Sequence, residues 1–349
     1  MKIKAIHVKN VGPLNQSLYF QDEWRGDVHN HILLSGPNGS GKTIILQAIS
    51  ILWETVGYWL DNRKMLKRNN PVQKWLQQWQ CTAMVLKECP HSDVPIVIFF
   101  GNIDDYNELR SKYENYKWIG EIAYGESKPR SKHKLMIPQE EWIDLWAEAR
   151  KKTILTFDKS DTPNVVWLDA EQRRWVTPRR NLGQTLPEDS KLRWLVTYQA
   201  TEDWQSQLES SLINLKYTKL HKYHKIIRDL NDFLYDKEID PNVKPGENRL
   251  QVILKNKRGK THAIDHLSAG EHQVMTQLYM ISRWLEEGGI VLIDEPDLFL
   301  HSSLIPGFLS KLESLVEEKN GQLIITSHNP DIWKRYERKG LRISLGGEH

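Results

Sequence analysis

A glycine-rich segment near the start of the chain has the spacing needed to hold a phosphate chain. The segment Gly36-Pro-Asn-Gly-Ser-Gly-Lys-Thr43 fits the pattern GxxxxGK[ST]. Its glycines let backbone N–H groups turn toward an anion, and the helix expected to follow adds the positive end of its dipole. We expect Lys42 to reach the β- and γ-phosphates of a nucleoside triphosphate and Thr43 to ligate Mg²⁺. The nucleotide-binding residues predicted here are Gly36, Asn38, Gly39, Ser40, Gly41, Lys42 and Thr43.

Two adjacent carboxylates follow a short apolar run far along the chain. Ile290–Ile293 is typical of a buried parallel strand, and Asp294 and Glu295 come directly after it. Because ligands bind at the carboxyl ends of strands in open α/β sheets, we interpret this run as a Walker B strand. We expect Asp294 to hold Mg²⁺ through its water shell and Glu295 to orient or deprotonate the attacking water.

A third motif, Leu267-Ser-Ala-Gly-Glu-His-Gln273, lies 20 to 30 residues before the carboxylates. Ser268 and Gly270 at a helix N-terminus form an anion site, although a motif standing alone would be a simple helix cap. The motif resembles the LSGGQ signature of ABC ATPases, in the LSxGExQ form of those related to SMC, RecF and OLD proteins. The resemblance implies that Ser268, Gly270 and Glu271 close over a nucleotide held by a second subunit.

Further segments carry the same resemblance over residues 1–60 and 248–345. Ile324-Ile-Thr-Ser-His-Asn-Pro330 is similar to the strand that ends in the switch histidine, which implies that His328 contacts the γ-phosphate and acts with Glu295 in catalysis. Glu295–His301 is similar to the DEPExxLH pattern of OLD-type ATPases, which places Asp297 in the subunit-contacting D-loop. The Q-loop glutamine stays open between Gln78 and Gln80.

The elements that position these residues alternate between strands and helices, so the predicted fold class is α/β. By resemblance it is a P-loop NTPase fold, an ABC ATPase head with a mixed sheet and a helical lobe that carries the signature motif. Residues 1–60 and 248–349 are expected to form the ATP-binding core, and residues 61–247 an inserted region with the helical lobe. The expected elements include strands at 96–100, 154–157, 165–168 and 323–326 and helices at 204–234, 269–285 and 302–315.

Basic residues and tryptophans are concentrated in the inserted region. Eleven of the 14 tryptophans lie between Trp53 and Trp204, and core packing is favoured over a partner-binding surface. Phosphate contact and an ordinary solvated surface are equally good readings of two basic sets. These are Lys216, Lys219, Lys222, Lys225 and Arg228 on a helix, and Arg173, Arg174, Arg179 and Arg180 in a loop.

Composition limits the remaining classes. The 349 residues correspond to about two domains, and the charged fraction of 27% excludes a membrane-spanning protein. The net charge of +3 is too small to indicate, by itself, a protein that binds nucleic acid. With two cysteines and no apolar secretion signal at the start, we expect a cytoplasmic protein.

The resemblance implies an ABC-class ATPase that hydrolyses ATP with Mg²⁺ and forms a head-to-head homodimer through two ATP sites. We expect ATP-gated dimerisation to control DNA engagement or a separately encoded nuclease or toxin effector, in DNA repair or antiphage defence. One alternative is a regulatory scaffold that binds only protein partners. A less favoured one is the ATPase subunit of a membrane transporter, which the DEPDLFLH segment and the large insertion disfavour.

Overall fold

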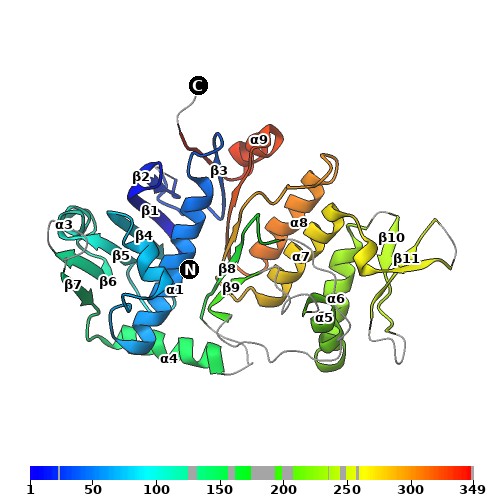
Figure 1. Cartoon of the computed structure of the whole chain (residues 1–349), viewed down its shortest axis with the longest axis horizontal. Coiled ribbons are helices and arrows are strands. Elements are labelled where there is room, and N and C mark those ends of the chain that lie inside the picture. Colours follow the sequence, from blue (N-terminus) through cyan, green and yellow to red (C-terminus); the bar gives the residue numbers. More distant parts are fainter. Residues whose placement is uncertain are drawn as a thin grey trace.

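The computed structural model describes residues 1–22, 24–124, 132–155, 162–173, 193–198, 207–234, 236–243, 249–256 and 259–346. In these ranges the strands form two six-stranded sheets and one three-stranded sheet. Figure 1 shows helix α1 (Lys42–Asn62) between the two large sheets. Further helices cover the other face of the large sheet that contains residues 290–293. The fold is α/β, as the alternation of elements in the sequence predicts.

One large sheet is entirely parallel, in the order β15-β3-β14-β13-β8-β9. Every residue of its central strands β3, β13 and β14 is buried, as expected for a parallel sheet with helices on both faces. The strand bounds are β3 His31–Ser35, β8 Val165–Leu168, β9 Leu195–Thr197, β13 Ile290–Ile293, β14 Gln322–Thr326 and β15 Leu341–Ser344.

The other large sheet is mixed, in the order β2-β1-β4-β5-β6-β7, with only the pair β5 and β6 parallel. Its bounds are β1 Lys2–Val11, β2 Leu14–Tyr19, β4 Cys81–Lys87, β5 Ile96–Asn102, β6 Lys117–Tyr124 and β7 Lys132–Met136. Helix α3 (Ile103–Lys112) packs beside β5 and β6, and the short helix α2 (Pro71–Leu76) precedes β4. The two large sheets therefore draw strands both from residues 1–60 and from the region expected to be inserted.

The core is divided by the parallel sheet into two layers. Alternate residues of β13 point to opposite sides: Ile290 and Leu292 pack with α1, whereas Val291 and Ile293 pack with the outer helices. The outer elements are α5 Gln207–Thr218, α6 Leu220–Asn231, α7 Ala269–Trp284, α8 Ile305–Glu317 and α9 Pro330–Lys339, with the small sheet β10 Lys237–Ile239, β11 Gln251–Leu254 and β12 Thr261–Ala263.

Helix α1 is covered by both large sheets, and its side chains are accordingly apolar on nearly all sides. By length and composition it is the one helix of the described residues that could cross a membrane, yet 67% of its most apolar window is buried inside the protein. Trp53 of this helix stacks on Trp194 with the ring centroids 4.2 Å apart, and each indole N–H donates to the other residue's backbone carbonyl at 2.9 Å. Trp146 of α4 (Glu141–Leu155) packs beside both. These tryptophans are core residues.

Most predicted elements are confirmed, and three need correction. The helix expected over 204–234 is two helices that meet at Lys219, where the Thr218 hydroxyl donates back to the Asn214 carbonyl and disturbs the helix. The strand expected at 154–157 is wrong for residues 154 and 155, which belong to α4, and residues 156 and 157 lie outside the described residues. The helix expected from Ser302 begins at Ile305, because Pro306 suits only a first helical turn.

Candidate nucleotide-binding and hydrolysis site

The glycine-rich loop joins β3 to α1 at the carboxyl edge of the parallel sheet. Gly36 has φ +141° and Gly41 has φ +93°, both in the region that favours glycine. A Cβ atom on Gly36 would lie 2.3 Å from the Leu345 carbonyl oxygen, and one on Gly41 would lie 2.6 Å from the Leu14 side chain. The two glycines therefore let the backbone turn tightly over the start of α1, where N–H groups without helical partners form an anion site.

Lys42 is folded into this loop. Its side chain is buried, and its Nζ donates to the carbonyl oxygens of Gly36 at 3.0 Å and Pro37 at 2.9 Å. Burial lowers the pKa of Lys42, while Glu295 and Asp294 act in the opposite direction. A phosphate oxygen is a stronger partner for an ammonium than a neutral carbonyl, so the loop holds this cation where a nucleotide would engage it.

Asp294 joins the loop to the neighbouring strands. It is 5% exposed, and it accepts hydrogen bonds from the Thr43 hydroxyl at 2.9 Å and from the Thr326 hydroxyl at 2.6 Å. A hydroxyl and a carboxylate are the hard oxygen donors that Mg²⁺ prefers, and Mg²⁺ often takes its other ligands from phosphates and water. The described residues hold no group of three or more His, Cys, Asp or Glu side chains placed to bind a metal. The pair Thr43 and Asp294 therefore fits Mg²⁺ delivered with a nucleotide.

Glu295 and His328 are brought together at the ends of β13 and β14. The His328 Nε2 atom lies 3.4 Å from Glu295 Oε1, and both side chains are about one third exposed, 38% for His328 and 33% for Glu295. Glu295 has φ +46°, an uncommon conformation for a residue with a side chain. Its N–H donates to Thr326 Oγ1 at 2.9 Å. The two predicted catalytic residues thus share one edge of the sheet with Lys42 and Asp294.

Arg173 is a site residue that the sequence reasoning missed. It was grouped with a basic loop, but its side chain is 1% exposed and its Nη2 donates to the carbonyls of Asp294 at 2.6 Å and Glu295 at 2.9 Å. Burial lowers its pKa to about 10, with Asp294, Asp169 and other carboxylates acting in the opposite direction, so it carries a charge at neutral pH. The signal in the sequence is its place five residues after β8, which becomes informative only once β8 is known to pair with β13.

The signature segment caps helix α7. The Ser268 hydroxyl accepts from the Glu271 N–H at 3.3 Å, and the Glu271 carboxylate accepts from the Ser268 N–H at 2.7 Å, which makes a capping box. Lys237 Nζ also binds both oxygens of Glu271, at 2.8 and 3.1 Å. No hydrogen bond or ion pair joins Ser268, Gly270 or Glu271 to residues 36–43, all of which are described. Within one chain the two predicted anion sites have no such direct link.

Gln78 and Gln80, the two glutamines considered for the Q-loop, lie just before β4 of the mixed sheet. Gln80 precedes β4 of the mixed sheet, where its amide nitrogen donates to Asp105 and its amide oxygen accepts from Asn10. Gln78 lies just before it, after α2. The strand beside β13 is β8, and the segment that follows it contains Gln172.

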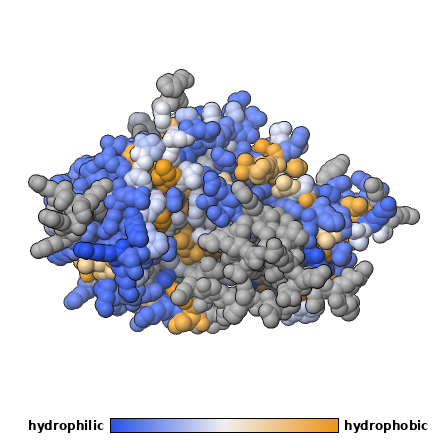
Figure 2. All heavy atoms as spheres, in the orientation of Figure 1, coloured by the Kyte–Doolittle hydropathy of each residue, from blue (hydrophilic) through white to orange (hydrophobic). Residues whose placement is uncertain are grey.

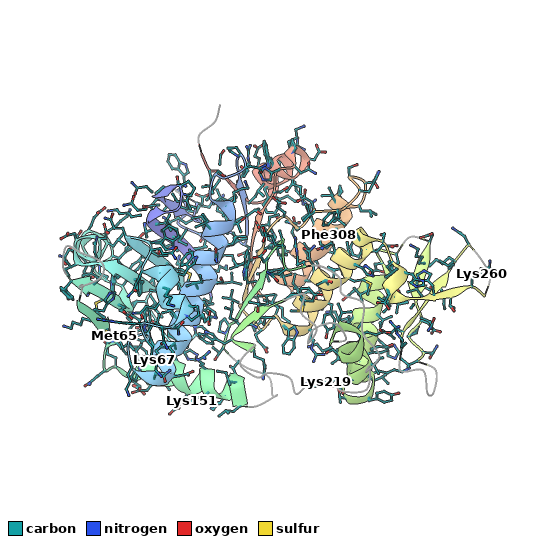
Figure 3. The ribbon with its side chains drawn as sticks, in the orientation of Figure 1. Met65, Lys67, Lys151, Lys219, Lys260 and Phe308 are labelled. Atoms are coloured by element: carbon teal, nitrogen blue, oxygen red, sulfur yellow. The ribbon has the colours of Figure 1, made fainter. Side chains whose placement is uncertain are left out.

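The basic residues of α5 and α6 are largely engaged within the chain. Lys216 donates to the Pro241 carbonyl, Lys222 to the Arg283 carbonyl, and Lys225 pairs with Glu318. Burial lowers the pKa of Lys222 to about 8. Lys219 is exposed and lies at the lower end of the helical lobe in Figure 3, away from the carboxyl edge of the sheet. Arg174, Arg179 and Arg180 lie outside the described residues.

Comparisons with known proteins found a matching family model and similar proteins. Residues 220–332 match the family model described as "AAA domain, putative AbiEii toxin, Type IV TA system". The "Retron Ec83 probable ATPase" of Escherichia coli is 25% identical over 220 residues, which cover 56% of this chain and 38% of that protein. "Protein ea59" of Escherichia phage lambda is 34% identical over 66 residues, which cover 19% of this chain and 13% of that protein. The matches therefore span well under two thirds of these relatives' lengths.

Solved structures that resemble the chain include an SMC head domain from Thermotoga maritima, with a TM-score of 0.45 and 14% identity, covering 99% of this chain and 94% of that one. A second is an SMC head bound to the C-winged helix domain of ScpA, with a TM-score of 0.45 and 11% identity over 95% of this chain and 90% of that one. By its phosphate-binding loop, the matched family model and the similarity to the retron ATPase together, the chain resembles a P-loop ATPase.

Proposed function

We propose that this protein is an ABC-class ATPase that hydrolyses ATP with Mg²⁺ and uses ATP to close a homodimer. The observation that carries the proposal is the convergence of five side chains at one edge of the parallel sheet, where Thr43 donates to Asp294 at 2.9 Å and His328 lies 3.4 Å from Glu295. The five are Lys42, Thr43, Asp294, Glu295 and His328. Glycine-loop, cation-binding and general-base groups are the parts that phosphoryl transfer to water requires.

Each residue of the site has a distinct proposed role. Lys42 and the backbone N–H groups of residues 38–42 hold the β- and γ-phosphates. Thr43 and Asp294 hold Mg²⁺, which neutralises phosphate charge when bound. Glu295 orients the attacking water and accepts its proton, and His328 steadies Glu295 and contacts the γ-phosphate.

The second nucleotide contact is proposed to come from another copy of the chain. Ser268 and Gly270 at the start of α7 offer an anion site but make no hydrogen bond or ion pair with residues 36–43 of their own chain, all of which are described. Phe299, 67% exposed, and Leu304, 38% exposed, lie between the Walker B carboxylates and α8, and Figure 2 shows an apolar patch over the start of that helix. Such a surface suits a partner that closes over it. Glu271 would act there through the cap that it makes with Ser268.

The proposed biological role is defence against phage, in the cytoplasm, with a separately encoded nuclease or toxin effector. The matched family model is described as a putative toxin of a type IV toxin–antitoxin system, and the retron protein as a probable ATPase, which supports an ATPase that acts with a toxin. DNA engagement has weaker support, because three of the five basic residues on α5 and α6 are bound within the chain. A DNA-repair role depends on such engagement, so we place it second.

Steady-state ATP hydrolysis with Mg²⁺ tests the proposal. The Glu295→Gln variant should retain ATP binding while its kcat falls by about 10²- to 10⁴-fold, since the general base is lost. Lys42→Ala should weaken binding of a labelled ATP analogue by about 30-fold or more, because a buried charge contact is lost. Glu114→Gln, on an exposed turn after α3, is the matched control and should behave as the wild type.

Hydrolysis at the wild-type rate by Glu295→Gln would contradict the assignment of the base. Adding double- or single-stranded DNA at low and moderate salt separates the two roles. Stimulation that fades as salt rises would favour DNA engagement, because phosphate contacts weaken steeply with salt. A rate that does not respond to DNA would favour a protein effector.

A further inference from the structure

Arg173 lies directly behind the two Walker B carboxylates, on the segment that follows β8. Its guanidinium is buried and donates two hydrogen bonds from Nη2, to the carbonyl of Asp294 at 2.6 Å and to that of Glu295 at 2.9 Å. It therefore contacts the backbone that carries the carboxylates, whereas Thr43 and Thr326 contact the carboxylate of Asp294.

The backbone that Arg173 contacts is strained. Glu295 has φ +46°, and a side-chain-bearing residue stays in this region only when its surroundings hold it there. Its N–H is held by Thr326 Oγ1 at 2.9 Å, and its carbonyl is held by Arg173 at 2.9 Å. The peptide groups on both sides of the Glu295 Cα atom are thus fixed, and with them the direction of its side chain toward His328.

Arg173 is also joined to the signature helix. Its own carbonyl accepts from Gln273 Nε2 at 2.6 Å, and one turn further along α7 Gln277 Nε2 donates to the Pro296 carbonyl at 3.1 Å. Gln273 is five residues after Ser268, the cap of that helix. A continuous set of contacts therefore runs from the start of α7 through Gln273 and Arg173 to Glu295.

Several buried polar atoms in this cluster have no hydrogen-bond partner among the described residues. They are Nε and Nη1 of Arg173, Oε1 of Gln273, Oε1 of Gln277 and Oδ1 of Asp297. Among the described residues, the guanidinium therefore makes its hydrogen bonds through Nη2 alone, and both go to the backbone of the Walker B carboxylates.

We propose that Arg173 is a positioning residue that holds the Glu295 backbone in its hydrolytic conformation and couples it to the signature helix α7. The inference rests on the proposed ATPase function. In the closed dimer the α7 N-terminus meets the nucleotide of the partner, so its position reaches Glu295 through Gln273 and Arg173. The cluster's buried donors and acceptors that have no partner among the described residues allow one hydrogen bond to replace another when α7 moves.

The test compares Arg173→Met with the wild type in ATP hydrolysis and thermal unfolding. Misplacing the base should lower kcat by about 10- to 100-fold and leave KM and nucleotide affinity within about threefold. The melting temperature should fall no further than in Arg150→Met, because both variants leave buried polar partners without a donor. Arg173→Lys keeps the charge and a donor and should recover part of the lost kcat. Arg150→Met is the matched control. Arg150 is also a buried arginine, but it pairs with Asp61 between α1 and α4, so its loss should lower stability and spare kcat.

The coupling to α7 has its own variant. Gln273→Met removes the hydrogen bond to the Arg173 carbonyl without touching the guanidinium, so it should lower kcat in the same direction as Arg173→Met and leave KM unchanged. The double variant should then lose less than the product of the two single losses, because both changes break the same path. Wild-type kcat in Gln273→Met, or multiplicative losses in the double variant, would refute the coupling.

The positioning role itself is overturned if Arg173→Met keeps kcat within about twofold, or if Arg150→Met loses as much kcat as Arg173→Met does. Failure of the proposed function looks different. If the wild type hydrolyses no more ATP than Glu295→Gln does, the ATPase proposal is refuted, and the role of Arg173 falls with it.

Discussion

At the scale of single residues, the nucleotide site combines side chains that motif spacing identifies with others that only the fold reveals. Lys42, Asp294 and Glu295 follow from motifs, because the chemistry of phosphate and Mg²⁺ demands those residue types at those places. Arg173 does not, since its contacts depend on β8 lying beside β13. The resemblance implies a nucleotide-binding role for Glu271, and in the structure its carboxylate accepts from the Ser268 N–H and binds Lys237.

A buried histidine makes the stability of the fold depend on pH. His7 of β1 is 4% exposed, and its ring nitrogens lie 2.6 Å from Ser17 Oγ and 2.9 Å from the Tyr113 hydroxyl oxygen. Burial, with a smaller effect from Lys112, lowers its pKa from 6.5 to about 4. The unfolded chain therefore binds a proton before the folded one does. The stability that neutral His7 contributes is present above pH 6.5 and is lost as the pH falls toward 4.

We expect His7 to make the free energy of unfolding about 2 kcal/mol smaller at pH 5 than at pH 7. Urea unfolding of the wild type and of His7→Gln at both pH values measures this contribution, because the other titrating groups cancel in the difference. The same change with pH in both proteins would show that His7 does not carry it.

At the scale of elements, local pattern predicts what lies next to the motifs and fails where pairing is distant. The strands at 290–293 and 323–326 and the helix that begins at Ala269 were predictable from apolar runs and a cap. The partners of β8 were not, because its neighbour β13 lies more than a hundred residues along the chain. The break at Lys219 was missed because the apolar seam continues through both α5 and α6.

The tryptophan cluster tests the packing of α1 against its neighbours. Trp53 is fully buried and stacks on Trp194, with reciprocal hydrogen bonds. Trp53→Ala should lower the free energy of unfolding by about 3–5 kcal/mol, since it leaves a large cavity and removes a hydrogen bond. Trp24→Ala is the control, because Trp24 is 96% exposed and its loss should change stability by less than about 0.5 kcal/mol. Equal effects in urea unfolding would contradict the packing described here.

At the scale of the whole molecule, the parallel sheet brings the candidate nucleotide site to one edge, and α7 begins with Ser268 and Gly270, which make no hydrogen bond or ion pair with the described residues 36–43. In Figure 1 the mixed sheet lies on one side of α1 and the parallel sheet on the other, with α4 near the lower end of α1. In the proposed function, a second copy of the chain would complete the nucleotide-binding site at this edge, and ATP would control the association of the two chains. Effector control would follow from the difference between the open and closed states.

The most direct test of this account is the mass of Glu295→Gln in light scattering with and without ATP and Mg²⁺. We predict that the mass doubles from that of one 41.0 kDa chain when ATP is added. The doubling should be lost in Glu295→Gln combined with Ser268→Asp, because aspartate keeps the helix cap but repels the γ-phosphate of the partner's nucleotide. A mass that ATP does not change, although ATP is bound, would contradict the ATP-gated dimer.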